Sequence, residues 1–448
     1  MRKILIKNYL AKKKPLKDIN GLITTKNPDE QIKQAEILKE WIDLNFLYQT
    51  PSKIWELDIV GVKEHFKHLD ILEDPKLFDK IIKEISKKVV GEKNTIKTIF
   101  LCTCGRLVKN SQMTSYNLLI NSESSAGKDY VSSRTLEILP KEIYIKRTRI
   151  TEKIFTYWHN PKFEPDWTWD GKVFYNEDIS NNVLNGEVFK TFSSSSSHAT
   201  VLINQRPCDI EIRGKPVMIV TTASSIPNKE IRGRYPIINL NETIDQTKAI
   251  MKRAGELAKS GTRIEYNPDL IDAQKFLKRE EVVIPFADKL YTYLPAESIM
   301  MRRHFERFLD YIKASTVLYQ KQRERDEKGR LIARGQDYDN GRIALLKSTS
   351  NPLMIPLTRK EEKILEIIEK LDKDDINNSW SVNELLKHIT FFSDKHLRTI
   401  LDKLTDYGFL KKDREQRENT KQEVTVYLFK NLMKIKIPKW SKLSFKVS

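Results

Sequence analysis

The segment LLINSESSAGKDYVSSRTLEIL constrains the fold more than any other part of the sequence. An apolar strand pattern runs into a turn of small and polar residues, and a helical pattern begins after Gly127 and Lys128. Backbone N–H groups at the start of a helix bind phosphate oxygens, and a lysine there reaches the β and γ phosphates of a nucleotide. The sequence therefore predicts a phosphate-binding loop between a buried strand and a helix.

This loop departs from the usual pattern, GxxxxGK followed by Ser or Thr. Ser122 stands where a glycine is usual, and Asp129 stands where a hydroxyl would ligate Mg²⁺. A carboxylate ligates Mg²⁺ directly but places negative charge beside a triphosphate, so an altered metal site and weakened nucleotide binding both stay open. An ordinary serine-rich turn before a helix is the alternative for this segment alone. The residues predicted to surround the nucleotide are Ser122, Glu123, Ser124, Ser125, Ala126, Gly127, Lys128 and Asp129.

A second apolar strand pattern, KVFYNEDIS, ends in the acids Glu177 and Asp178. Carboxylates that follow such a strand hold Mg²⁺ and orient the attacking water in phosphoryl transfer. We expect Glu177 near the metal or the water, with Asp178 as its partner and Asp129 as a further metal ligand. The sequence does not assign the roles of the two acids. Acids that simply end a strand in a turn are the alternative.

Strand and helix patterns alternate through the middle of the chain. The strand patterns are YNLLI, IYIKRT, KVFYNEDI, TVLINQ, DIEIRG and PVMIVTTAS, and a helix is predicted over 129–139. This alternation predicts an α/β fold with a mostly parallel sheet, here a P-loop core over 81–290. A long helix over 301–326 and the shorter DYDNGRIALLKS then predict a separate helical lid over 291–350.

The C-terminal region over 357–430 has the pattern of a winged helix. Three helix patterns follow the candidate N-caps Thr358, Ser381 and Ser393, and Gly408 is the candidate stop of the last one. Two strand patterns around a charged loop complete the wing. A basic tail follows over 431–448.

The last of these helices has one apolar stripe and one polar face. Its buried stripe is predicted to contain Leu397, Ile400, Leu401 and Leu404. Its exposed face and the wing carry the predicted DNA contacts, which are Lys395, Arg398, Lys403, Lys411, Lys412 and Arg414, together with His396, Thr399 and Arg417. Such a helix fits the major groove, and basic wing residues suit phosphates. A protein-interaction module is the alternative.

The charge balance favours a polyanionic partner. Lysine and arginine number 79 against 61 acids, which gives a formal charge of +18. A lysine-rich proteome is the alternative cause. No apolar run reaches the length of a membrane span, the start turns basic too soon for a secretory leader, and the spacing of Cys102 and Cys104 fits no zinc site. We therefore expect a cytoplasmic chain whose first 80 residues form a basic helical region interrupted at Pro51.

With these motifs in order, residues 89–348 resemble the helicase-like ATPase regions of mobile-element primase-helicase proteins. More distantly, they resemble the minichromosome-maintenance branch of AAA+ helicases. The segments that carry the likeness are VVGEKNTIKTIFL, NSESSAGKDYVSS, VFYNEDIS, MIVTTAS, RGRYPIINLNETIDQTKAI and RRHFERFLDYIKASTVLYQKQRERDEKGRLIA. The order of the motifs is more specific than any one of them.

The resemblance implies further roles for residues of this chain. Thr222, which follows Thr221 at the end of a strand, would be the polar sensor between the acids and the γ phosphate. Arg232 and Arg234 would be presented to the neighbouring subunit as an arginine finger. Arg303 in RHFE would be a second sensor that reaches back to the γ phosphate. TVLINQRPCDIEIRGKP would form a β-hairpin with Arg206 at its tip, in contact with DNA.

The implied function is an ATP-dependent DNA helicase or translocase that uses ATP and Mg²⁺ and assembles as a homo-oligomeric ring. Neither a primase metal motif nor a polymerase-like domain precedes the core, so a primase or polymerase partner would be a separate chain. The alternative is a DNA-binding replication initiator or regulator whose degenerate loop is a nucleotide switch or is inactive. Ser122 and Asp129 discriminate the two, because a motor needs triphosphate bound with Mg²⁺.

Overall fold

The computed structural model describes residues 6–7, 23, 25–51, 55–122, 127–151, 155, 167–186, 197–203, 206–222, 229–294, 300–348, 359–374, 379–390, 392–406, 409–416, 423–429 and 437–443. The chain divides into two compact units, one of Met1–Leu77 with Pro268–Phe276 and one of Phe78–Asn267 with Leu277–Ser448. Within the described ranges, no helix combines the length and the apolar character that a membrane crossing requires.

The first unit is built from helices and a short hairpin around Trp41, which is fully buried. Its elements are α2 (Pro28–Asp43), β1 (Leu47–Gln49), β2 (Trp55–Leu57), α3 (Ile59–Leu72), α12 (Pro268–Ala273) and η4 (Gln274–Phe276). The sequence predicts helices here, and Pro51 lies in the turn between the two antiparallel strands. The hairpin itself and the distant segment that completes the unit were not predicted.

A five-stranded parallel sheet with the strand order β4-β5-β8-β3-β9 forms the centre of the second unit. Its strands are β3 (Leu118–Asn121), β4 (Tyr144–Arg147), β5 (Val173–Asn176), β8 (Val217–Thr222) and β9 (Ile237–Asn239). The prediction of a parallel α/β core is confirmed. Strands β5 and β8 are buried along their whole length, as expected for parallel strands covered on both faces.

Helices precede, separate and follow these strands along the chain. They are α4 (Leu77–Ile85), α5 (Lys93–Cys104), α6 (Lys128–Leu136), α8 (Asn181–Leu184), α10 (Lys229–Arg234), α11 (Ile244–Ser260) and α13 (Ala287–Leu290), with the 3-10 turns η2 (Gly105–Leu107), η3 (Met113–Tyr116) and η5 (Tyr291–Tyr293). The helices α5 and α6 pack on β8. Ile231 and Tyr235, at α10, belong to an apolar cluster that includes Met218 and Val220 of β8.

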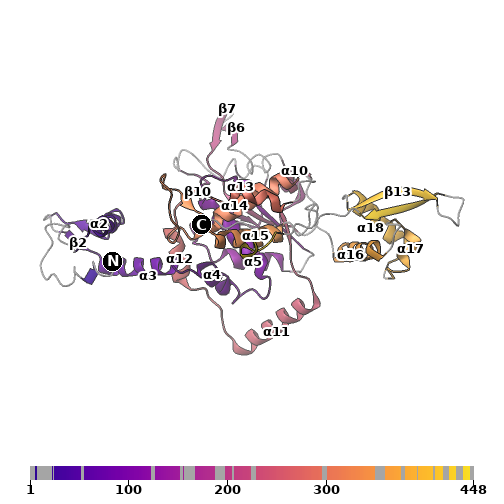
Figure 1. Ribbon diagram of the computed structural model, residues 1–448, viewed down its shortest axis with the longest axis horizontal. Coiled ribbons are helices and arrows are strands. Elements are labelled where there is room, and N and C mark those ends of the chain that lie inside the picture. Colours follow the sequence, from indigo (N-terminus) through magenta and orange to yellow (C-terminus); the bar gives the residue numbers. More distant parts are fainter. Residues whose placement is uncertain are drawn as a thin grey trace. The chain divides into compact units, whose positions relative to one another are not determined.

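The strands β6 (Ser197–Ile203) and β7 (Arg206–Ile212) form an antiparallel hairpin that is a separate two-stranded sheet (Figure 1). The hairpin that the resemblance implies before β8 is therefore present. The turn residues at 204 and 205 lie outside the described residues.

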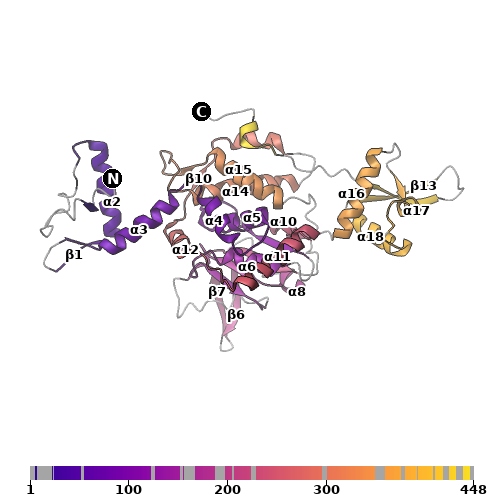
Figure 2. The ribbon, with the colours of Figure 1, turned by 90° about the horizontal axis from the view of Figure 1, so that it is seen from below.

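Two long helices, α14 (Met300–Leu318) and α15 (Gly335–Ser348), pack against each other and against α5 (Figure 2). The predicted long helix over 301–326 was too long, because α14 ends at Leu318. Beyond that point Arg323 donates to the fully buried Asp337 at the start of α15, which requires the chain to turn back. The short parallel strands β10 (Val282–Val283) and β11 (Leu331–Ile332) were also missed.

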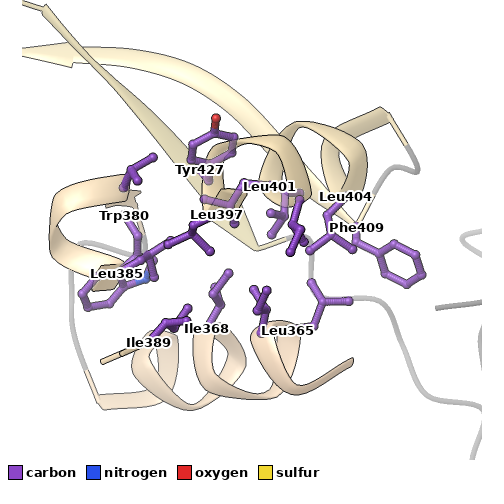
Figure 3. Close-up of a cluster of buried hydrophobic side chains, with 14 residues drawn as sticks. Leu365, Ile368, Trp380, Leu385, Ile389, Leu397, Leu401, Leu404, Phe409 and Tyr427 are labelled. Carbon is purple, nitrogen blue, oxygen red and sulfur yellow. The ribbon is translucent and has the colours of Figure 1, made fainter. Parts of the chain in front are cut away.

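Near the C-terminus, helices and a three-stranded sheet of order β12-β14-β13 enclose their own apolar core. The elements are α16 (Arg359–Asp374), β12 (Trp380–Ser381), α17 (Val382–Leu386), α18 (Asp394–Asp406), β13 (Leu410–Gln416) and β14 (Glu423–Phe429). Figure 3 shows Ile368 of α16 and Leu397 and Leu401 of α18 directed into this core. The later turn η6 (Trp440–Lys442) packs on α15 instead, where the Trp440 ring contacts the ring of Tyr338.

The buried stripe predicted for α18, which contains Leu397, Ile400, Leu401 and Leu404, is confirmed. Ser381 caps α17 as predicted, and it forms a capping box with Glu384. The predicted cap Thr358 and the predicted stop Gly408 lie outside the described residues.

Candidate nucleotide-binding site at the ends of strands β3, β5 and β8

The predicted phosphate-binding loop follows β3 and ends where α6 begins. Ser122 is 8% exposed, and its hydroxyl has no hydrogen-bond partner among the described residues. Residues 123–126 of the predicted loop lie outside the described residues. Gly127 has a φ of 85°, and a Cβ added to it would meet no atom of the described residues within 4 Å. The chain therefore enters α6 through a left-handed position that favours glycine.

Lys128 is the first residue of α6 and is only 6% exposed. Its Nζ lies 3.6 Å from Oδ2 of Asp129 and 3.9 Å from Oδ1 of Asp178. The buried ammonium therefore lies between one carboxylate from the start of α6 and one from the end of β5. These distances allow ionic attraction but are too long for strong hydrogen bonds.

Thr221, near the end of β8, joins the two acids. Its Oγ1 donates to the carboxylate of Asp129 and accepts the backbone N–H of Asp178 at 2.8 Å. Asp178 has a φ of 50°, a left-handed conformation that a non-glycine residue rarely adopts. One hydroxyl thus orients a carboxylate at the helix start and fixes the strained turn that ends β5.

The predicted sensor, Thr222, points elsewhere. Successive side chains of a strand face opposite sides of a sheet, and the Thr222 hydroxyl lies 3.5 Å from the backbone oxygen of Ile179. Thr221 is therefore the threonine that contacts the acids. The sequence named both threonines, but the choice between them needs the orientation of β8 in the sheet.

Glu177 forms an ion pair with Lys146 of β4, and its N–H donates to the backbone oxygen of Arg147 at 3.2 Å. The two acids after β5 therefore have different partners, because Asp178 is the one beside Lys128. That Glu177 and Asp129 both ligate Mg²⁺ stays a prediction. In the described part of the chain, no group of three or more His, Cys, Asp or Glu side chains could hold a metal ion.

Tyr175, on β5, lies under the site. Its hydroxyl donates to the backbone oxygen of Asp129 at 3.4 Å. Burial raises the pKa of Tyr175, and the negative charges of Asp129 and Glu177 raise it further. Tyr175 therefore stays protonated and acts as a neutral donor that supports the start of α6.

Arg303 lies beside α10. Its Nη1 is 1.7 Å from the position that a Cβ on Gly233 would occupy. Gly233 separates the two predicted finger residues. The Arg232 side chain lies outside the described residues, and Arg234 is partly buried. The structure thus brings Arg303 to the helix that carries the predicted arginine finger.

Most of the predicted DNA-contacting cations of the C-terminal helices and strands are paired with nearby acids. The N–O distances of these ion pairs are 2.9 Å for Arg398 with Asp394, 2.6 Å for Lys403 with Glu361, 2.7 Å for Lys411 with Asp413 and 2.7 Å for Lys412 with Asp402. The Glu361 side chain is 4% exposed, so Lys403 neutralises a buried carboxylate. This role is structural.

Three predicted DNA contacts present their charge more openly. Lys395 on α18 and Arg414 on β13 are exposed, and neither forms an ion pair within the described residues. Arg206 is exposed at the start of β7, where it pairs with Ile203 across the hairpin.

Residues 62–275 match the model of a family described as the MTBMA_p00010 P-loop domain. The match extends from α3 to the end of α12 and its following turn, and it includes Lys128, Thr221 and both acids after β5. No curated protein matches the chain. This region is therefore similar to a P-loop domain, a class that generally binds nucleotide with Mg²⁺.

Proposed function

We propose that the chain is an ATP-dependent DNA helicase or translocase of the AAA+ type, which hydrolyses ATP at the ends of β3, β5 and β8. The observation that carries the proposal is the position of the Lys128 ammonium. It is buried at the start of α6, the helix that follows β3 and the predicted phosphate-binding loop, and it lies between the carboxylates of Asp129 and Asp178. The parallel sheet and the match to a P-loop domain support it.

The residues present fit a bound triphosphate. The buried Ser122 hydroxyl lacks a hydrogen-bond partner among the described residues, so it has a donor available for a phosphate oxygen. No atom of the described residues lies within 4 Å of a Cβ built on Gly127, so the described part of the chain leaves a ligand room close to the backbone there. The N-terminus of α6 adds its positive dipole end and its N–H groups.

The residues divide the work as follows. Lys128 would bind the β and γ phosphates, and Asp129 and Asp178 would hold Mg²⁺. Thr221 keeps both acids in place through its hydroxyl. Glu177 would act as the base for the attacking water after it leaves Lys146. Bound ATP with Mg²⁺ supplies the transferable γ phosphoryl group, and Arg234 of a neighbouring subunit would stabilise its charge.

DNA would be bound by the hairpin and by the C-terminal helices and strands, which we interpret as a winged helix. Lys395 and Arg414 would make the phosphate contacts there, because their charges are not neutralised by neighbouring acids of the described chain. Arg206 would contact DNA from the hairpin. The formal charge of +18 favours such a partner.

A second candidate function follows from Asp129. Two carboxylates beside Lys128 offset its positive charge, which weakens the attraction for a triphosphate when no Mg²⁺ is bound. This favours a DNA-binding replication initiator or regulator in which the site is a slow nucleotide switch or is inactive.

The rate of ATP hydrolysis by the full chain, with and without single-stranded DNA, distinguishes the two. We expect DNA-stimulated hydrolysis that Lys128→Ala abolishes and that Lys259→Ala, a change of an exposed α11 lysine, leaves unchanged. Hydrolysis equal in Lys128→Ala and the parent protein would remove the motor function. DNA binding without hydrolysis in the parent protein would favour the regulator.

A further inference from the structure

We propose that Arg307, with Arg303, is a positioning residue that holds α10 from α14 and thereby presents Arg234 to the neighbouring subunit. The inference deepens the proposed function and rests on its assembly of subunits. The observation behind it is the contact of both α14 arginines with Gly233, the glycine directly before Arg234.

One side of α10 is fixed by the sheet. Ile231 and Tyr235 are fully buried, and the Tyr235 hydroxyl lies 3.1 Å from Sδ of Met218 on β8. The Tyr235 N–H donates to the Ile231 backbone oxygen at 2.8 Å, which closes the last turn. A helix this short has few backbone hydrogen bonds of its own, so its contacts with other elements decide how rigidly it is held.

Arg307 holds the opposite side of α10 through the Gly233 backbone. Its Nη2 donates to the Gly233 oxygen at 3.2 Å, and the Arg307 side chain is 3% exposed. Its Nε and Nη1 have no hydrogen-bond partner among the described residues. A buried guanidinium with one hydrogen bond costs stability, and an apolar side chain of similar volume would be as stable or more so. The arginine is therefore poorly explained by folding alone.

Arg303 makes the same approach one turn earlier on α14. Its Nη1 is 1.7 Å from the position of a Cβ on Gly233, so no residue larger than glycine fits while Arg303 keeps this position. The guanidinium of Arg303 therefore lies directly against Gly233, although as the exposed end of a flexible side chain it can move aside.

The helix α14 also contacts the segment just before β3, the strand that leads into the predicted phosphate-binding loop. Farther along α14, Asp310 accepts the Ser115 hydroxyl at 2.6 Å, and its backbone oxygen accepts the Tyr116 hydroxyl at 3.0 Å. Both donors lie just before β3. The helix α14 is therefore bonded both to the start of β3 and to α10, so it can hold the finger in a fixed relation to its own subunit's site.

Hydrogen exchange of the backbone amides of α10 tests the contact directly, without nucleotide. We expect the Tyr235 amide to exchange about tenfold faster in Arg307→Met, because the bond to Gly233 is lost, while global unfolding is unchanged or shifts to higher denaturant. Gly233→Ala should change the rate less than Arg307→Met, because it displaces only the flexible end of Arg303. Gly255→Ala is the matched control, because a Cβ there meets no atom of the described residues within 4 Å. Unchanged α10 exchange in Arg307→Met overturns the proposal.

Mixed assemblies test the function of the contact. Arg307→Met subunits should hydrolyse ATP about tenfold more slowly alone, and a mixture with Lys128→Ala subunits should recover activity, as a mixture of Arg234→Ala with Lys128→Ala subunits does. Recovery with Arg234→Ala but full activity of Arg307→Met alone overturns the proposal. No recovery in the mixture of Arg234→Ala with Lys128→Ala subunits contradicts the proposed arginine finger in trans. The role of Arg307 in presenting that finger is then contradicted as well. The hydrogen-exchange experiment still tests the contact of Arg307 with α10 separately.

Discussion

The ends of β3, β5 and β8 and the surface around α18 both gather charged side chains, but they differ in how those charges are held. At the sheet, Lys128 is buried between the carboxylates of Asp129 and Asp178, and the Thr221 hydroxyl bonds to the Asp129 carboxylate and to the Asp178 backbone N–H. Around α18, exposed cations form simple ion pairs with neighbouring acids, as Lys412 does with Asp402.

The difference teaches which charges indicate function. Exposed ion pairs contribute little to stability and are screened by salt. A basic surface is therefore little evidence for DNA binding when its cations are paired with neighbouring acids. A buried lysine between acids is costly and persists only where its surroundings favour it. The assignment of nucleotide binding therefore rests on stronger ground than the assignment of DNA contacts to particular side chains.

Separate substitutions of the two acids after β5 are the most severe test of this comparison. Glu177→Gln should slow hydrolysis about 100-fold with nucleotide binding intact, because it removes the base. Asp178→Asn should weaken Mg²⁺-dependent nucleotide binding about tenfold, because it removes a ligand beside Lys128. Binding and hydrolysis measured on both variants check this. The reverse pattern would exchange the roles that their partners imply.

The stability of the protein as a function of pH tests whether a polar side chain buried in the second unit, His304, is shielded from protonation. Burial, together with the nearby charge of Arg307, lowers the pKa of His304 to about 3. Its pKa in the unfolded chain is near 6.5, so the unfolded state binds the extra proton between these values, and stability falls as pH falls. The loss is on the order of 1.4 kcal/mol per pH unit.

We expect His304→Leu to flatten this pH dependence without loss of stability at neutral pH. Urea midpoints at a series of pH values measure it. An equally steep acid loss in the variant would show that other groups cause it.

The two adjacent threonines of β8 form a matched pair. Thr221→Val should slow hydrolysis about tenfold, because the Asp178 N–H and the Asp129 carboxylate lose their shared partner. Thr222→Val should change it little, since that hydroxyl lies 3.5 Å from a backbone oxygen. Hydrolysis rates of the two variants measure this, and a larger effect at Thr222 would assign the sensor role to Thr222.

The smallest expected effect concerns the C-terminal cations. Lys403→Met should lower the stability of this region by about 1 kcal/mol, because Glu361 stays buried without its cation. Lys395→Met should leave stability unchanged and reduce the salt dependence of DNA binding by about one counterion. Hydrogen exchange of α16 and DNA titrations at several salt concentrations measure both. Equal effects of Lys403→Met and Lys395→Met on DNA binding would contradict the distinction between a structural cation and one that contacts DNA.

Local patterns predicted much of the fold. The stripe of α18 and the Ser381 cap followed from helical periodicity and capping chemistry, because both depend on residues within a few positions. The order of strand and helix patterns likewise predicted a parallel sheet with a lysine at the start of α6.

Features that depend on distant residues could not be predicted. The end of α14 at Leu318 reflects the bond of Arg323 to the buried Asp337. The short strand β12 exists because β14 pairs with it. The choice of Thr221 follows from strand orientation, and the ion pair of Glu177 follows from Lys146 on a neighbouring strand. None of these contacts has a pattern within its own segment.

Equilibrium binding of a non-hydrolysable ATP analogue to the full chain tests the central claim most directly. Calorimetric titrations with and without Mg²⁺ should give saturable, Mg²⁺-dependent binding in the parent protein and in Lys259→Ala, and none in Lys128→Ala. Binding of equal strength in Lys128→Ala would contradict the account, because the buried ammonium at the start of α6 would then not be what holds the phosphates.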